Sequence, residues 1–91
     1  QLLKSKELHL MRLDKYLKVS RIIKRRTVAK QAAEKEKIEI NGRLAKPSTA
    51  VKENDILTLY FGSKIIKVKV TSLEPKKDLL MYELLQEEKR P

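Results

Sequence analysis

Apolar residues recur at helical spacing near the start of the chain. Leu13, Tyr16 and Leu17 follow an i, i+3, i+4 pattern, which is typical of one face of an amphipathic helix. The pattern predicts a short helix over residues 12–19. Residues 20–23 then form a connection, and its two isoleucines are expected to pack inward.

A second helix is predicted over residues 25–35. Its inward stripe consists of small residues, which allow two helices to approach closely: Val28, Ala29, Ala32 and Ala33. Isolated helices of this length are marginal in water, because nucleation is costly. The pair is therefore expected to depend on packing against the rest of the fold.

After residue 37 the period changes from helical to alternating, which indicates strands. Asn41-Gly42 is a strong signal for a tight hairpin turn, because both residues tolerate positive φ. In the last predicted strand, Leu80, Tyr82 and Leu84 alternate with Met81, Glu83 and Leu85. The predicted strands are 38–40, 56–60, 66–70 and 80–85. The pattern predicts an α+β fold, with two short helices packed on a small, mainly antiparallel sheet around a single core.

The positive charge is concentrated in one segment. Residues 11–30 hold eight Lys or Arg and one acid, Asp14, within a chain of net charge +10. A clustered basic patch on a globular domain is typical of nucleic-acid binding. An anionic membrane surface is the rival partner. A merely solvated charged face is the third interpretation, but it predicts mixed signs, which this segment lacks.

Other function classes lack support in the sequence. The chain of 91 residues has room for one domain with a limited core and has no cysteine, so it has no thiol nucleophile and no zinc–thiolate site. It has no nucleotide-binding glycine loop, no nucleophile–base pair and no cluster of metal ligands. No apolar run approaches the roughly 18 residues of a membrane span. We therefore expect a cytoplasmic protein that is not an enzyme and needs no cofactor or metal.

Several short motifs occur together in this chain and resemble the S4 RNA-binding domain. The resemblance covers about residues 12–60. The motifs are Arg12-Leu13-Asp14-Lys15-x-Leu17, Lys24-Arg25-Arg26-x-x-Ala29, Ile38-x-Ile40-Asn41-Gly42, Lys46-Pro47-Ser48 and Val51-x-x-x-Asp55-Ile56-Leu57. The resemblance implies the S4 fold, also called the αL motif, in a single domain over residues 11–85. Met11 followed by Arg12 resembles a translation start, so residues 1–10 are expected to be an N-terminal extension. Residues 86–91 are expected to be a frayed polar tail.

The whole of residues 11–91 is similar to stand-alone bacterial S4 proteins. This closer resemblance implies binding to large-subunit ribosomal RNA and to P-site tRNA, in quality control of stalled peptidyl-tRNA complexes with poly-alanine tailing. It also implies a tRNA-recruiting quality-control protein as partner, a monomeric state and no membrane. One alternative is a heat-shock-type S4 factor that recycles free large subunits carrying nascent chains. The other is a protein-interaction or membrane-surface module that does not bind RNA.

The predicted RNA contacts are basic residues of the two helices and of the hairpin turn. They are Arg12, Lys15, Lys18, Arg25, Arg26, Lys30 and Arg43. Asp14, Asn41 and Gly42 are predicted to be structural supports. Asp14 is expected to pair with Lys18, four residues along the helix, or with a basic residue of the second helix.

Two positions depart from the usual S4 pattern, which has glycine at each. The chain has Glu36 after the second helix and Asn54 before the long strand. Asparagine tolerates a left-handed backbone, so the second change is expected to be mild. Glu36 is expected to weaken the cap and to end the helix in a different turn.

Overall fold

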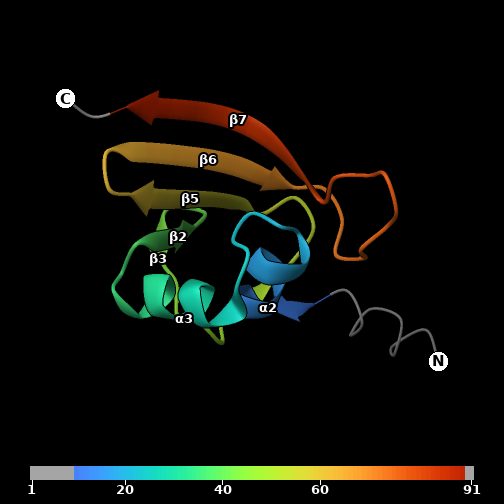
Figure 1. The fold of residues 1–91 in the computed structure, drawn as a ribbon, viewed down its shortest axis with the longest axis horizontal. Helices are drawn as coiled ribbons and strands as arrows, with labels where there is room; N and C mark the ends of the chain where they lie inside the picture. The colour runs from blue at the N-terminus through green and yellow to red at the C-terminus, as the bar shows by residue number, and fades with distance from the viewer. Residues whose placement is uncertain (1–9, 90–91) are drawn as a thin grey trace.

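The computed structural model describes residues 10–89, so the predicted extension at 1–10 lies almost wholly outside the described residues (Figure 1). The fold is α+β, as predicted. Its elements in chain order are β1 (Met11–Arg12), α2 (Leu13–Val19), α3 (Arg26–Glu34), β2 (Ile38–Ile40), β3 (Arg43–Leu44), β4 (Ala50–Val51), β5 (Ile56–Phe61), β6 (Lys64–Val70) and β7 (Tyr82–Lys89).

The two helices pack on each other through the predicted stripes, with one exception. Leu13, Tyr16 and Leu17 of α2 are fully buried, and Ala29 of α3 is buried against them. Val28 was predicted to face inward, which is wrong, because 47% of it is exposed. Successive helical residues are about 100° apart. Val28 therefore lies on the solvent side of a stripe whose centre is nearer to Ala29 and Ala33.

The C-terminal end of α3 keeps the turn that glycine usually forms. Glu36 has φ of +61°, in the left-handed region. Its N–H donates to the Ala33 carbonyl (3.0 Å), and the Lys37 N–H donates to the Ala32 carbonyl (3.0 Å). This bond pair defines a Schellman motif. The expectation of a different turn is therefore wrong. The helix ends in the usual Schellman turn, and Glu36 adopts the strained left-handed conformation that glycine usually adopts there. Asn54 likewise adopts a left-handed φ, +75°.

One antiparallel sheet of five strands has the order β3-β2-β5-β6-β7, and a second pair joins β1 to β4. The turn between β2 and β3 has two residues, Asn41 with φ of +53° and Gly42 with φ of +83°. Positive φ at both positions is the requirement of a type I′ hairpin turn, which explains the Asn-Gly pair. In Figure 1 the helices lie next to β2, β3 and β5, whereas β7 forms the edge farthest from them.

The last strand differs from its prediction at both ends. It begins at Tyr82 rather than at residue 80 and continues to Lys89, so the expectation that residues 86–89 are frayed is wrong. Polar residues of β7 pair with β6 as far as Lys64, opposite Lys89, and the register shifts between Lys67 and Val68. Pairing with a neighbouring strand, rather than burial, therefore holds this segment.

The segment before β7 is fastened to α2. The Tyr16 hydroxyl donates to the Met81 carbonyl (2.8 Å), and both residues are buried. Burial, with a smaller contribution from Tyr82, raises the pKa of Tyr16, so the hydroxyl stays protonated and able to donate. This bond joins residues 65 positions apart. It places the C-terminal loop and strand against the end of the first helix.

Candidate nucleic-acid interface

A single buried carboxylate organises the basic surface of the helix pair. Asp14 lies in the first turn of α2, and only 4% of its side chain is exposed. Its two oxygens accept hydrogen bonds from Arg12 Nε and Nη2 (both 3.2 Å) and from Arg26 Nη2 (3.4 Å). It also accepts the backbone N–H of Lys15 (2.8 Å). We call Arg12, Asp14 and Arg26 the arginine clamp.

The clamp fixes two guanidinium groups that come from different elements. Arg12 precedes α2, and Arg26 is the first residue of α3. About half of each arginine side chain is exposed, 52% and 49%. A guanidinium carries five N–H donors, so contact with Asp14 leaves donors available for an anionic ligand. The clamp has a net charge of +1 and two guanidinium groups held in place.

The protonation state of Asp14 is tuned by this contact. Burial alone would raise its pKa, but the hydrogen bonds from Arg12, from the Lys15 N–H and from Arg26 outweigh burial. The net result is a pKa below the ordinary value for aspartate. Asp14 therefore remains charged at any pH near neutrality and keeps both arginines paired.

The partner of Asp14 on the second helix is Arg26, which is the second of the two predicted alternatives. Lys18, the first alternative, is exposed. Arg12 was not predicted as a partner of Asp14. Residues two positions apart do not face each other on a helix, but Arg12 lies before the helix. Arg12 has an extended backbone (φ −61°, ψ 144°) at the N-cap. This conformation lets its side chain reach the carboxylate.

The other predicted contact residues are all exposed. Lys15 and Lys18 project from α2 and Lys30 from α3, whereas Arg43 is on the β2–β3 hairpin, opposite Ile40. Arg25 is the N-cap of α3, where no side chain caps the helix and no acid occupies the first turn. The helix N-terminus offers N–H groups and a positive dipole end to an anion.

The loop that precedes β4 completes one side of this surface. The Thr49 and Pro47 carbonyls accept the first N–H groups of α2, from Leu13 (2.9 Å) and Asp14 (3.1 Å). A groove of about 640 Å³ runs between this loop and α3, and Arg12, Lys30 and Lys46 are among its lining residues. Lys46 was not selected from the sequence. Its only signal there was membership of the Lys46-Pro47-Ser48 motif.

Asn41 does more than form its turn. Its side-chain amide donates to Asp55 Oδ1 (3.1 Å) and its side-chain oxygen accepts the Ile56 N–H (2.9 Å). Asp55 is buried and also accepts the Lys52 N–H (2.9 Å). The hairpin is thereby tied to the start of β5. Asp55 was not predicted to have a role, although it belongs to the Val51-x-x-x-Asp55-Ile56-Leu57 motif.

Between residues 10 and 89, no group of three or more His, Cys, Asp or Glu side chains could hold a metal ion. Within the same range, no helix is both long and apolar enough to cross a membrane.

Comparison with protein families and curated proteins finds clear relatives. The S4 domain family matches residues 11–57. An RQC P-site tRNA stabilizing factor of Listeria innocua is 57% identical over 83 residues, which are 87% of this chain and 90% of that protein. The protein of the same name from Bacillus subtilis is 53% identical, over 87% of this chain and 96% of its own length.

Heat-shock proteins of the S4 type are also similar. A Heat shock protein 15 homolog of Aeromonas salmonicida is 33% identical over 86% of this chain and 60% of that protein. Among solved structures, trimeric Heat Shock Protein 15 of Vibrio cholerae superposes with a TM-score of 0.74 at 27% identity. That match covers 84% of this chain and 82% of the other.

Proposed function

This chain belongs to the S4 domain family and, within it, to the RQC P-site tRNA stabilizing factors, and on that premise we propose that it binds P-site tRNA and large-subunit ribosomal RNA. In this role it acts in ribosome-associated quality control in the cytoplasm. It holds peptidyl-tRNA on a stalled large subunit while a partner protein recruits the alanyl-tRNA with which the nascent chain is extended. It acts as a binding factor and carries out no catalysis.

The observation that carries the proposal is the arginine clamp. Lysine and arginine side chains that neutralise phosphates release condensed counterions, which drives binding at moderate salt. The two clamp arginines are held by the same buried carboxylate, so they present a fixed spacing to the RNA backbone. Fixing them before binding lowers the entropy that must be lost when the complex forms.

The remaining predicted contacts extend this surface along both helices. Lys15, Lys18 and Lys30 supply further positive charge, Arg25 marks the uncapped start of α3, and Arg43 adds the hairpin. Such a surface suits folded RNA, which proteins recognise largely through shape and phosphate positions. Phosphate contacts position the protein without reading base sequence. We therefore expect recognition of RNA architecture rather than of a nucleotide motif.

Sedimentation of variants with large ribosomal subunits tests the proposal. Arg12→Ala and Arg26→Ala should each lower the fraction that co-sediments at physiological salt. Circular dichroism should show that each variant is folded. Lys35→Ala, an exposed lysine at the other end of α3, is the matched control and should sediment like the unsubstituted protein. Full co-sedimentation of both arginine variants would contradict the proposal that the helix pair forms the RNA interface.

The similarity to Heat Shock Protein 15 supports a second candidate, a factor that recycles free large subunits carrying nascent chains. The higher identity and fuller coverage of the P-site tRNA factors favour the first candidate. A map of RNA cross-links in cells separates the two. Cross-links to tRNA together with large-subunit RNA near the P site are expected for the first candidate, whereas cross-links without tRNA would favour the second.

A further inference from the structure

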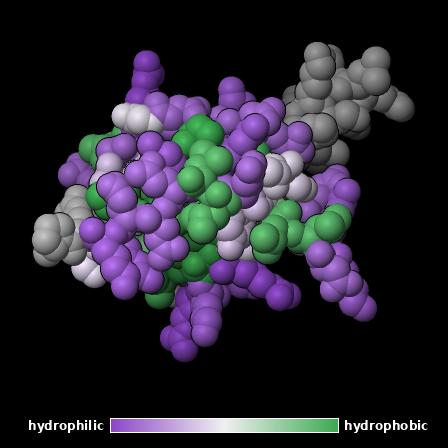
Figure 2. Space-filling view, turned by 90° about the horizontal axis from the view of Figure 1, so that it is seen from above, coloured by the Kyte–Doolittle hydropathy of each residue, from purple (hydrophilic) through white to green (hydrophobic). Residues whose placement is uncertain are grey.

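Four of the exposed leucines fall within one short segment, residues 79–85, outside the arginine clamp. Leu79, Leu80, Leu84 and Leu85 are 64%, 71%, 53% and 44% exposed. Figure 2 looks down on the side of β7 and shows hydrophobic surface gathered between hydrophilic margins. Single exposed leucines are ordinary on protein surfaces, but a cluster of them indicates an interaction site.

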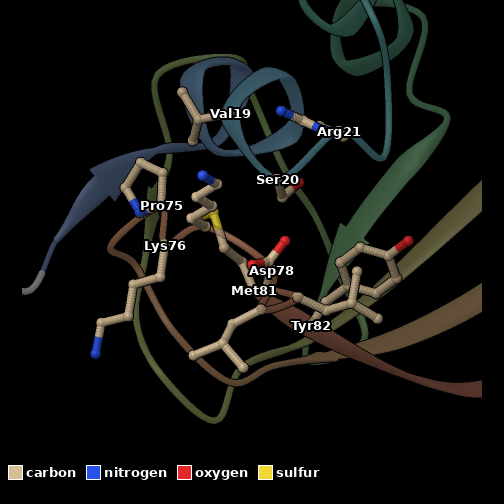
Figure 3. Close-up of a pocket in the computed structure, with 11 residues that line it drawn as sticks. Val19, Ser20, Arg21, Pro75, Lys76, Asp78, Met81 and Tyr82 are labelled. Atoms are coloured by element: carbon tan, nitrogen blue, oxygen red, sulfur yellow. The ribbon is translucent and has the colours of Figure 1, made fainter.

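A hollow of about 620 Å³ lies beside the two most exposed leucines. One wall is Val19, the last residue of α2, with Ser20 and Arg21 after it, and the other is the segment from Pro75 to Tyr82 (Figure 3). We call this the loop hollow. Its walls come from positions more than 50 residues apart in the chain and meet where Tyr16 is bonded to Met81.

The loop wall has a defined internal structure. The Leu79 N–H donates to the Lys76 carbonyl (3.3 Å), and the two residues form an isolated antiparallel bridge. The Thr71 and Ser72 N–H groups both donate to the Met81 carbonyl (2.9 and 3.1 Å). Met81 itself is buried, so the exposure of Leu79 and Leu80 does not result from an unattached loop.

Both walls contain a residue in a strained backbone conformation. Arg21 has φ of +67° and Asp78 has φ of +66°, and both line the hollow. A left-handed conformation costs a non-glycine residue roughly 1 kcal/mol or more. Such residues cluster at binding sites, where the surroundings hold them in place. Arg21 directly follows the C-cap of α2, so its positive φ ends that helix, as the positive φ of Glu36 ends α3. The exposed leucines, rather than the strain, mark this hollow.

The charges around the hollow indicate the chemistry of its ligand. Arg21, Lys76 and Lys77 are exposed at its edge and are opposed by one acid of the lining, Asp78. The lining also includes Val19, Pro75 and the two exposed leucines. The site therefore combines an apolar surface with a net positive charge. A ligand that satisfies both has acidic groups next to apolar ones.

We propose that the loop hollow docks a segment of a partner protein that presents acidic side chains beside apolar ones. Phosphates of RNA would pair with the basic residues but would leave Leu79 and Leu80 in water. A second copy of this chain is opposed by its net charge of +10. The hollow and the arginine clamp lie at opposite ends of α2 and share no residue, so a partner protein and RNA can be bound at the same time.

Amide chemical shifts of the isotope-labelled full chain test the proposal. The probe is a short synthetic peptide of Glu and Leu, and a peptide with Lys in place of Glu is its control. The Glu–Leu peptide should shift the amides of residues 19–21 and 75–82, and the Lys–Leu peptide should not. Leu79→Ala with Leu80→Ala should weaken binding roughly tenfold or more, because burial of two leucines is lost.

Two matched variants make the test specific. Leu44→Ala removes an equally exposed leucine (58%) on β3 and should leave peptide affinity unchanged. The Leu79/Leu80 variant should still co-sediment with large subunits, so failure here is distinct from failure of the RNA proposal. Equal loss in the Leu44 variant overturns the proposal, as do shifts confined to the helix pair. Shifts of 75–82 on adding oligouridine would assign the hollow to RNA, and shifts on concentrating the protein alone would assign it to self-association. Either result overturns a protein-docking site.

Discussion

Two ion-pair sites, at opposite sides of the fold, differ in how their charges are held. On the helix pair, the buried carboxylate of Asp14 contacts two arginines. On the β6–β7 ladder, Lys64 Nζ and Glu87 Oε2 are 3.3 Å apart, and their side chains are 45% and 43% exposed. The distances are alike, but the surroundings are not, and the surroundings decide what each pair can do.

Burial turns the first pair into a positioning device. A buried carboxylate needs its partners, because an unpaired charge away from water costs several kcal/mol. Arg12 and Arg26 are therefore held in one arrangement. The exposed pair is screened by water and salt, and such pairs contribute about 0–1 kcal/mol. The helix side of the molecule is organised for fixed cations, whereas the β7 side keeps its leucines and charges open to solvent.

The largest expected effect is the difference in stability cost between removing a buried leucine of α2 and removing an exposed leucine of the segment before β7. Leu17→Ala in α2 should lower the free energy of unfolding by about 3 kcal/mol, because Leu17 is fully buried. Leu80→Ala should change it by less than about 0.5 kcal/mol, because 71% of Leu80 is exposed. Urea unfolding followed by circular dichroism measures both. A cost near 3 kcal/mol for Leu80→Ala would mean that the loop is packed and that the two sides do not differ.

The next effect concerns the clamp itself. Asp14→Asn should lower the free energy of unfolding by about 2 kcal/mol, because it replaces charge-assisted bonds to two arginines by neutral ones. It should also weaken co-sedimentation with large subunits, although it adds net positive charge. A purely electrostatic role for the surface predicts the opposite, tighter binding. That opposite result would show that Asp14 does not position the arginines.

The same variant gives a pH test. The pKa of Asp14 is lowered in the folded protein, so its contribution to stability is fully present above the unfolded pKa, about 3.9. That contribution is lost as the pH falls through the lower, folded pKa. The stability difference between the unsubstituted protein and Asp14→Asn should therefore stay constant from neutral pH to about 4 and shrink below it. A difference that is independent of pH would contradict the assigned ionisation.

The helix side could be predicted from sequence because its signals are local. The spacing of Leu13, Tyr16 and Leu17 fixed the buried face of α2, and Asn41-Gly42 fixed the hairpin. Val28 was placed wrongly because a stripe of small residues has no sharp edge on a helix. The contact between Arg12 and Asp14 was not predicted, because it depends on the extended backbone of Arg12 at the start of the helix.

The β7 side was less predictable because its determinants are distant in sequence. Residues 86–89 are polar and look like a tail, yet β6 supplies their partners. Gln86 pairs with Lys67 and Leu84 with Val68, so Leu85 is an extra residue of β7 that the predicted alternation counted as a regular one. Met81 is buried in the core and its carbonyl accepts the Tyr16 hydroxyl, and no pattern near residue 81 reveals either contact. The structure of the β7 side is therefore determined by contacts between residues far apart in the sequence rather than by local conformational preference.

A smaller effect is expected at the end of α3, on the helix side. Glu36→Gly should raise the free energy of unfolding by about 1 kcal/mol, because glycine adopts φ of +61° without steric cost. Lys35→Gly is the matched control, since Lys35 has φ of −87°, and it should lower stability by about 0.5–1 kcal/mol. Thermal and urea unfolding measure both changes. A destabilised Glu36→Gly variant would mean that the Glu side chain makes a contact worth more than the strain.

The smallest effect returns to the exposed pair. Glu87→Gln should lower the free energy of unfolding by no more than about 0.5 kcal/mol at low salt, and the difference should vanish near 1 M salt, because exposed charges are screened. Asp14→Asn should keep most of its cost at the same salt, since its carboxylate is buried. Urea unfolding at both salt concentrations compares the two variants directly. If Glu87→Gln proved as costly as Asp14→Asn and equally resistant to salt, the contrast between a buried, positioning ion pair and an exposed one would fail. The edge of β7 would then have to be regarded as an organised charge site in its own right.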